Sequence, residues 1–173
     1  EIGSARGSEG EKEGLRSILK WAEHRNCLER MEILGFVDGG KSAAWIHECG
    51  GRVLNLLAKG SENHCRIQLR KEPEQHFSDV CREIERAGKM GLSVNVYLED
   101  WSNGMADSFP YVVAFLRRLA EMEVERVMLP DTLGILTPEQ VTRYLDWVYS
   151  AVPGLRLDFH GHNDYGLVTA NSL

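Results

Sequence analysis

The sequence of 173 residues lacks the features that are typical of nucleic-acid-binding, membrane-spanning and disordered proteins. Basic charge is not in excess, since 20 Lys and Arg stand against 26 Asp and Glu, and this balance argues against a nucleic-acid partner. No apolar run approaches the roughly 18–20 residues of a membrane helix, so no membrane partner is expected either. Hydrophobic residues make up 43% and charged residues 27%, which indicates a folded globular protein rather than a disordered chain.

Closely spaced cysteines are also absent. The four cysteines, Cys27, Cys49, Cys65 and Cys81, form no C-x-x-C pair. This spacing argues against a structural zinc site and against a disulfide scaffold. Cys49 and Cys81 fall on apolar faces of predicted helices, where a free thiol packs as a small hydrophobic group. We therefore expect reduced cysteines and a cytoplasmic protein.

The beginning of the chain carries no basic-then-apolar leader. It opens on Glu1-Ile2-Gly3, as if in the middle of a strand, so we interpret the sequence as a piece of a longer protein.

What the sequence has in abundance is an alternation of short β-rich runs with amphipathic helices. Strands are predicted at residues 31–37, 53–57, 94–98, 127–129 and 155–159, and Glu1-Ile2 is taken as the end of another. Ser8 with Glu11, and Thr137 with Gln140, have the spacing of capping boxes that open helices. Each strand is followed by a helix or by the beginning of one.

This repeat predicts a parallel sheet covered by helices. A doubly wound sheet and a (β/α)8 barrel share the pattern, so periodicity alone leaves both open. A complete barrel takes about 250 residues, more than this chain has. No linker divides residues 1–173, and a single domain is expected.

In both architectures function collects at the carboxyl ends of the strands. The clearest motif there is His160-Gly161-His162. Residues i and i+2 of an extended strand project to the same side, so both imidazoles can face one divalent ion, with further oxygen ligands from another strand. The alternative is a pair of solvated or core histidines in a loop, and for an isolated H-x-H both interpretations stay open.

Other strand ends carry further candidates. Tyr97 and Glu99 have the same i, i+2 relation, and Glu99 is either a general base or a carboxylate that caps a turn or pairs with Lys. Thr132, within the segment 131–134, offers a hydroxyl and nearby amides for a substrate carboxylate, or forms an ordinary turn. Arg6 either binds an anion or pairs with Glu9 or Glu11.

The remaining histidines have simpler interpretations. His24, His64 and His76 lie in polar stretches and are expected to be solvated. His47 lies in a predicted helix without a partner at ligand spacing.

Two longer segments carry a family resemblance. Residues 129–134 (LPDTLG) and 160–166 (HGHNDYG), with the closing 170–173 (ANSL), resemble the acyl-CoA-dependent 2-isopropylmalate, homocitrate and citramalate synthase family, to which HMG-CoA lyase is more distantly similar. The resemblance covers nearly the whole chain. It implies an incomplete TIM (β/α)8-type barrel, with about six βα units that correspond to the second to seventh strands.

The resemblance also implies an enzyme, a Claisen-type acyltransferase of branched-chain amino-acid biosynthesis. Its co-substrate would be acetyl-CoA and its acceptor a small 2-oxo acid. His160 and His162 would be ligands of a divalent Mg, Mn or Zn ion, Thr132 would hold the substrate carboxylate and Glu99 would be catalytic. A homodimer is expected for the full-length protein.

Three further segments resemble the citramalate branch, namely residues 32–38, 53–61 and 95–101. Leu34, Leu57 and Tyr97 would line the pocket for the substrate side chain and favour pyruvate, whose side chain is a methyl group. The alternatives are 2-isopropylmalate or homocitrate synthesis, or a fragment that is inactive alone.

The chain also departs from the family pattern. It lacks the family's first strand with its Arg-Asp pair, the eighth strand region with an Asn ligand, and the C-terminal regulatory domain.

Overall fold

The computed structural model describes all 173 residues and contains one six-stranded parallel sheet. The strands are β1 (Gly3–Ser4), β2 (Glu32–Phe36), β3 (Val53–Lys59), β4 (Ser93–Glu99), β5 (Arg126–Asp131) and β6 (Leu157–Gly161). The α-helices are α1 (Glu9–His24), α2 (Lys41–Glu48), α3 (Pro73–Lys89), α4 (Trp101–Asp107), α5 (Phe109–Ala120), α6 (Pro138–Ala151) and α7 (Val168–Asn171). A short 3-10 helix spans Leu28–Arg30, and a short π-helix spans His64–Gln68. The predicted βα repeat is confirmed, with the first strand at Gly3–Ser4 rather than at Glu1-Ile2.

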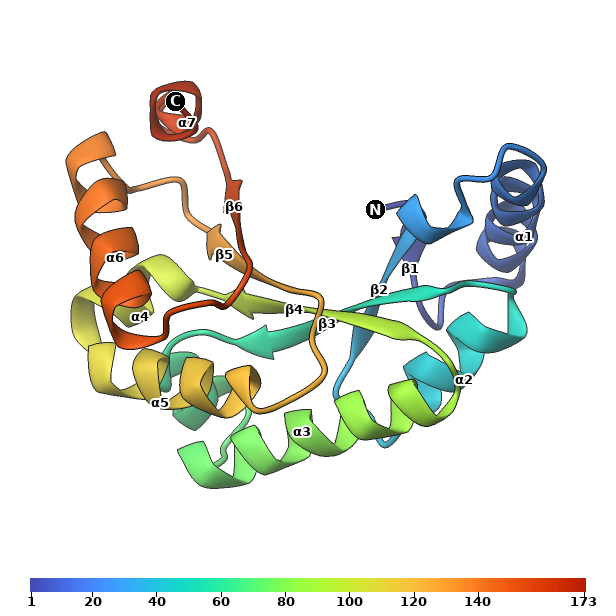
Figure 1. Cartoon of the computed structure of the whole chain (residues 1–173), viewed down its shortest axis with the longest axis horizontal. Coiled ribbons are helices and arrows are strands. Elements are labelled where there is room, and N and C mark those ends of the chain that lie inside the picture. Colours follow the sequence, from blue (N-terminus) through green and yellow to red (C-terminus); the bar gives the residue numbers. More distant parts are fainter.

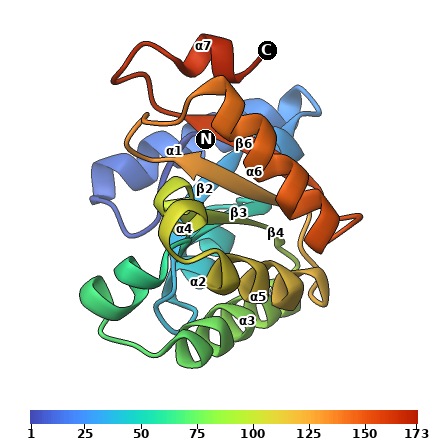
Figure 2. The same ribbon diagram turned by 90° about the vertical axis from the view of Figure 1, so that its left-hand side faces the viewer.

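The strand order decides between the two architectures that the sequence left open. The strands are hydrogen-bonded in chain order, β1-β2-β3-β4-β5-β6. A doubly wound sheet reverses its order at a switch point, and this sheet has no reversal. Winding in one direction bends the sheet into part of a barrel wall, with β1 and β6 on either side of an open concave face (Figures 1 and 2). The structure is thus an incomplete (β/α)8-type barrel.

Helices cover the convex side of this wall. In Figure 1, α2, α3 and α5 lie beneath the sheet, whereas the concave face above it carries no helix. On β3, Leu54, Leu56 and Ala58 are buried in the core that the sheet forms with these helices. The helix and sheet side chains form one continuous hydrophobic core.

Local sequence signals explain where two of the long helices begin. Ser8 and Glu11 form the predicted capping box at α1, and Thr137 and Gln140 form the one at α6. Each box satisfies backbone N–H groups that have no partner inside the helix.

A belt of polar side chains crosses the concave face near the amino ends of the strands. It consists of Glu32, Asn55, Asn95, Arg126 and Asp158, one from each strand from β2 to β6. Asn55 Nδ2 donates to Glu32 Oε2 at 2.9 Å, and Asn95 Nδ2 donates to Asn55 Oδ1 at 2.9 Å. Arg126 pairs with both Glu32 and Asp158. This polar belt forms the floor beneath the carboxyl ends of the strands.

His76 corrects a prediction from the sequence. Its neighbours are polar, yet its side chain is only 1% exposed, because α3 presents it to the layer between the sheet and α5. Cys49 and Cys65 are buried, Cys81 is half-buried, and all four cysteines are free. No helix has the length and apolar character required to span a membrane.

Candidate functional site

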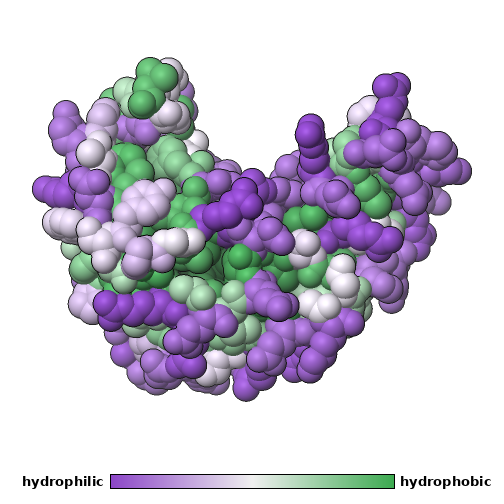
Figure 3. All heavy atoms as spheres, viewed as in Figure 1, coloured by the Kyte–Doolittle hydropathy of each residue, from purple (hydrophilic) through white to green (hydrophobic).

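The residues predicted from the sequence meet in one hollow on the concave face, at the carboxyl ends of the strands. Its volume is about 370 Å³. The space-filling view shows the molecule hollowed on this side, between the part that contains β1 and α1 and the part that contains β6 and α7 (Figure 3). The hollow is lined by Glu1, Leu34, Leu57, Tyr97, Glu99, Pro130, Thr132, His160 and His162. All seven predicted site residues are therefore brought together, while their chemical roles stay predictions.

The two histidines of β6 and its end point at each other. The distance from His160 Nε2 to His162 Nε2 is 3.3 Å. Two nitrogens that each lie about 2.1 Å from one ion are separated by roughly 3.0–3.4 Å, so this spacing fits a shared metal. No group of three or more His, Cys, Asp or Glu side chains that could hold a metal ion is present around the pair.

The surroundings of His160 favour a neutral imidazole. Its ring is partly exposed, yet nearby protein atoms lower its pKa by desolvation, and His162 lowers it further by repulsion. A neutral ring keeps the lone pair that metal binding requires.

Gly161, between the two histidines, has no space for a side chain, because an added Cβ would lie 2.4 Å from Val168 Cγ2.

An apolar wall lies next to the histidines. The ring of Tyr97 meets that of His160 edge-on, with centroids 5.5 Å apart. Burial raises the pKa of the Tyr97 hydroxyl, so it is neutral at ordinary pH. Leu57 is the register partner of Tyr97 on β3, and Leu34 lines the same hollow from β2. These three side chains limit the space beside the metal-ligand candidates.

Glu99 has an ion-pair partner that the sequence analysis did not identify as functional. The Nζ atom of Lys59 contacts Glu99 Oε2, and the two residues are register partners on β3 and β4. The available signal was the i, i+2 spacing of Leu57 and Lys59, which repeats that of Tyr97 and Glu99 on the next strand. The carboxylate thus lies at the hollow with a cation beside it.

Thr132 is held so that its hydroxyl proton is free for a ligand. Its Oγ1 accepts the N–H of Asp100 at 2.9 Å, so its O–H can point toward another acceptor. Asp131, which is fully buried, accepts the N–H groups of Ile135 and Leu136 at 3.2 and 2.9 Å. Those two amides shape the turn and are not available to a substrate.

Arg6 lies outside the residues that line the hollow. It pairs with neither Glu9 nor Glu11, because its Nη1 contacts Asp38 Oδ2 at 3.2 Å. Its φ of 64° places the backbone in the left-handed region, which turns the chain after β1.

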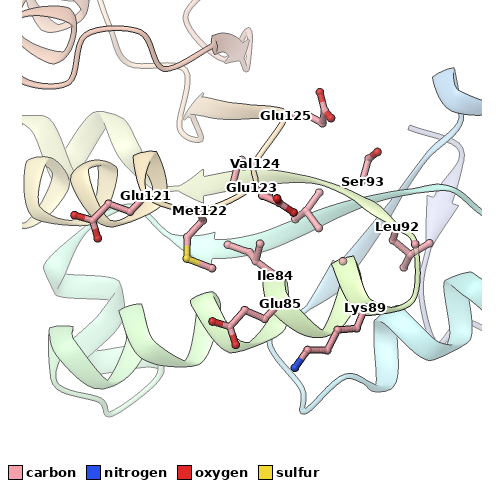
Figure 4. A pocket seen from close by; sticks show the side chains of 13 residues that line it. Ile84, Glu85, Lys89, Leu92, Ser93, Glu121, Met122, Glu123, Val124 and Glu125 are labelled. Atoms are coloured by element: carbon pink, nitrogen blue, oxygen red, sulfur yellow. The ribbon is translucent and has the colours of Figure 1, made fainter.

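A larger hollow of about 840 Å³ lies at the opposite ends of the strands, between the end of α3 and the segment that follows α5. Glu85, Glu121 and Glu125 line it, but their carboxylates point in different directions (Figure 4). The seven residues predicted from the sequence line the smaller hollow instead.

Comparison with known proteins identifies the family of this chain. The HMGL-like family model matches residues 1–173. The chain is 30% identical over 175 residues to an (R)-citramalate synthase of Methanocaldococcus jannaschii, which covers 99% of this chain and 33% of the relative. It is also 30% identical over 162 residues to a homocitrate synthase of Sulfurisphaera tokodaii, covering 93% of this chain and 34% of the relative.

Solved structures support the fold. The chain superposes on hydroxymethylglutaryl-CoA lyase from Pseudomonas aeruginosa with a TM-score of 0.70 and 23% identity, over 82% of this chain and 48% of that one. The chain spans about a third of the length of the curated relatives named above. Because the family model extends over every residue of the sequence, the chain belongs to the HMGL-like family.

Proposed function

We propose that the protein to which this chain belongs is a metal-dependent Claisen-type acyltransferase that condenses acetyl-CoA with a small 2-oxo acid. The observation that carries the proposal is the convergence of a paired-imidazole half-site, a carboxylate and a hydroxyl donor in one hollow. The similarity to citramalate and homocitrate synthases supports the same reaction class. Residues 1–173 would be part of the catalytic barrel.

In this proposal His160 and His162 hold a divalent Mg, Mn or Zn ion through their Nε2 atoms. The ion, when bound, supplies Lewis-acid polarisation of the 2-oxo carbonyl. The remaining ligands must come from outside this set, because the structure groups no further His, Cys, Asp or Glu side chain with the pair.

Thr132 would bind the substrate, and Glu99 would accept a proton. Thr132 donates its hydroxyl proton to the substrate carboxylate, since its oxygen is already held by Asp100. Glu99 is placed to accept a proton from the acetyl methyl group, or from the water that hydrolyses the thioester. The new carbon–carbon bond joins that methyl carbon to C2 of the 2-oxo acid, while the π bond of the C2 carbonyl breaks and its oxygen takes up a proton to become the hydroxyl group of the product. Hydrolysis of the thioester then releases CoA.

Pyruvate is the acceptor that the apolar wall favours. Leu34, Leu57 and Tyr97 stand beside the hollow, and bulky side chains leave room for a methyl group more readily than for a branched one. A few methylenes are worth about 1–3 kcal/mol of discrimination, so the wall sets a preference among 2-oxo acids. The product would be citramalate.

The experiment is an assay of CoA release by the full-length protein, with acetyl-CoA and either pyruvate or 2-oxoisovalerate. We expect metal-dependent turnover that favours pyruvate. Turnover with 2-oxoisovalerate far above that with pyruvate would instead assign 2-isopropylmalate synthesis. No release with any 2-oxo acid, in the presence of Mg²⁺, Mn²⁺ or Zn²⁺, would refute the acyltransferase proposal.

A further inference from the structure

Strand β3 continues beyond its neighbour β2 at the edge of the site. The register between them ends with Phe36 opposite Leu57, whereas β3 runs on to Lys59. On the other side, β4 still pairs with this end, and Gly60 N–H donates to Glu99 O at 2.6 Å. The Lys59 peptide therefore needs partners other than β2.

Two buried side chains from the helix layer supply those partners. The N–H of Lys59 donates to Nε2 of His76, on α3, at 3.1 Å. The hydroxyl of Tyr111, on α5, donates to the carbonyl oxygen of Lys59 at 2.8 Å. Both backbone groups of one residue are thus held by side chains from two different helices.

The rings of His76 and Tyr111 belong to one buried aromatic cluster. His76 lies edge-on to Phe115 with centroids 5.4 Å apart, and Phe77 stacks on Phe115 at 4.4 Å. His76 is 1% and Tyr111 5% exposed, so neither has water to replace its bond to Lys59. A side chain fixed by surrounding rings holds its hydrogen-bond partner at a defined position.

The protonation of His76 agrees with its role as an acceptor. An imidazole that accepts at Nε2 is neutral and carries its proton on Nδ1, which is one of its two neutral tautomers. Burial, together with the charge of Lys71, lowers the pKa of His76 to about 4. The acceptor is therefore present throughout the neutral pH range.

We infer that His76 and Tyr111 are positioning residues, which fix the Lys59 peptide so that the Lys59 ammonium aims the Glu99 carboxylate into the hollow. His76 and Tyr111 hold the backbone of Lys59, and the Lys59 side chain forms the ion pair with Glu99. Because a displacement of about 1 Å at a reacting group costs up to about 100-fold in rate, a small loosening of Lys59 is measurable. This inference rests on the proposed catalytic role of Glu99.

The test is a double-mutant cycle on the full-length protein, with CoA release as the readout. Lys59→Met and His76→Leu should each lower kcat by roughly 10- to 100-fold, with KM for pyruvate within about twofold. If His76 acts through Lys59, adding His76→Leu to Lys59→Met should change kcat by less than about twofold. Full multiplication of the two losses would overturn the inference.

Two further variants separate positioning from general damage. His76→Gln keeps an acceptor near Nε2 and should restore most of the lost kcat. His47→Leu makes the same change at an exposed site on α2 and should leave kcat unchanged. Should His76→Leu fail to fold, Tyr111→Phe removes only the second hydrogen bond, and its loss of kcat should likewise disappear in the Lys59→Met background.

Amide hydrogen exchange tests this inference without an activity assay, so its result is independent of the proposed function. Amide hydrogen exchange at Lys59 should quicken roughly tenfold or more in His76→Leu and return toward the wild-type rate in His76→Gln. A protein without synthase activity but with this pattern would refute the proposed function and retain the positioning of Lys59. Unchanged exchange in His76→Leu would overturn the inference even in a fully active enzyme.

Discussion

Gly104 of α4 lies directly against the backbone of Gly60, at the end of β3. A Cβ added to Gly104 would be 2.1 Å from the carbonyl oxygen of Gly60. The contact is between backbones, so no side chain can move aside to relieve it. It packs the middle of α4 against the residue that follows Lys59, the last residue of β3.

Replacing Gly104 with Ala should therefore destabilise the protein by about 1–3 kcal/mol, because the helix must shift away from β3. Gly88 of α3 is the matched control, since an added Cβ there meets no atom within 4 Å. Gly88→Ala should stabilise by roughly 0.5–1 kcal/mol through helix propensity. Urea unfolding of both variants measures the difference, and a Gly104→Ala variant as stable as Gly88→Ala would contradict the close contact.

Replacing His162 with Ala should weaken metal binding by about 100-fold or more, because one of two adjacent nitrogens is removed. The melting temperature should change little, since His162 is exposed and makes no core contact. Calorimetric titration of Mn²⁺ or Zn²⁺ into the full-length protein provides the measurement, with His47→Ala as the control. Equal affinity in wild type and His162→Ala would return the pair to the interpretation of two solvated histidines.

Replacing Leu57 with Ala should broaden the choice of 2-oxo acid. Removing three carbons beside Tyr97 enlarges the hollow, and kcat/KM for 2-oxobutanoate relative to pyruvate should rise roughly tenfold. Leu56→Ala is the control, because Leu56 is fully buried on the opposite face of β3. That variant should lose stability with the substrate ratio unchanged. A ratio that moves equally in both variants would show that the wall does not select the substrate.

Acid should destabilise the protein through His76. The folded-state pKa of about 4 lies below the ordinary value of about 6.5, so the unfolded chain binds the extra proton first. The resulting stability is complete above pH 6.5 and declines as the pH falls from 6.5 to 4, by about 2 kcal/mol at pH 5.

The measurement for His76 is urea unfolding at pH 7.5 and pH 5, compared with His76→Gln, which does not titrate. The variant should lose about 2 kcal/mol less than the wild type over this interval. Parallel pH dependence in the two proteins would mean that folding leaves the pKa of His76 at its ordinary value.

The βα repeat was predictable because its signals are local. Capping boxes at Ser8 and Thr137 act within one helical turn, and apolar periodicity reports which face a helix or strand buries. The same pattern predicts which residues lie at the carboxyl ends of the strands. Since parallel strands place their carboxyl ends on one side of a sheet, the pattern predicts that His160, Thr132 and Glu99 share an edge.

Contacts between distant residues were not predictable in this way. Lys59 and Glu99 are 40 positions apart in the chain, and only the register of β3 against β4 makes them neighbours. His76 sits in a polar stretch, which favours exposure, yet α3 turns it into an aromatic cluster formed with Phe77 and Phe115. Neighbours in sequence say little about a side chain whose partners come from other elements.

The sequence alone determined the order of helices and strands, and which residues stand at the strand ends, because both depend on periodicity and capping over a few residues. Tertiary structure decided the direction in which the sheet winds, since doubly wound and barrel arrangements share one local pattern. It also decided the distance of 3.3 Å between the Nε2 atoms of His160 and His162, and the hydrogen bonds of His76 and Tyr111 to the Lys59 backbone. Those distances depend on how a curved sheet and its helix layer pack, and packing is a property of the whole chain.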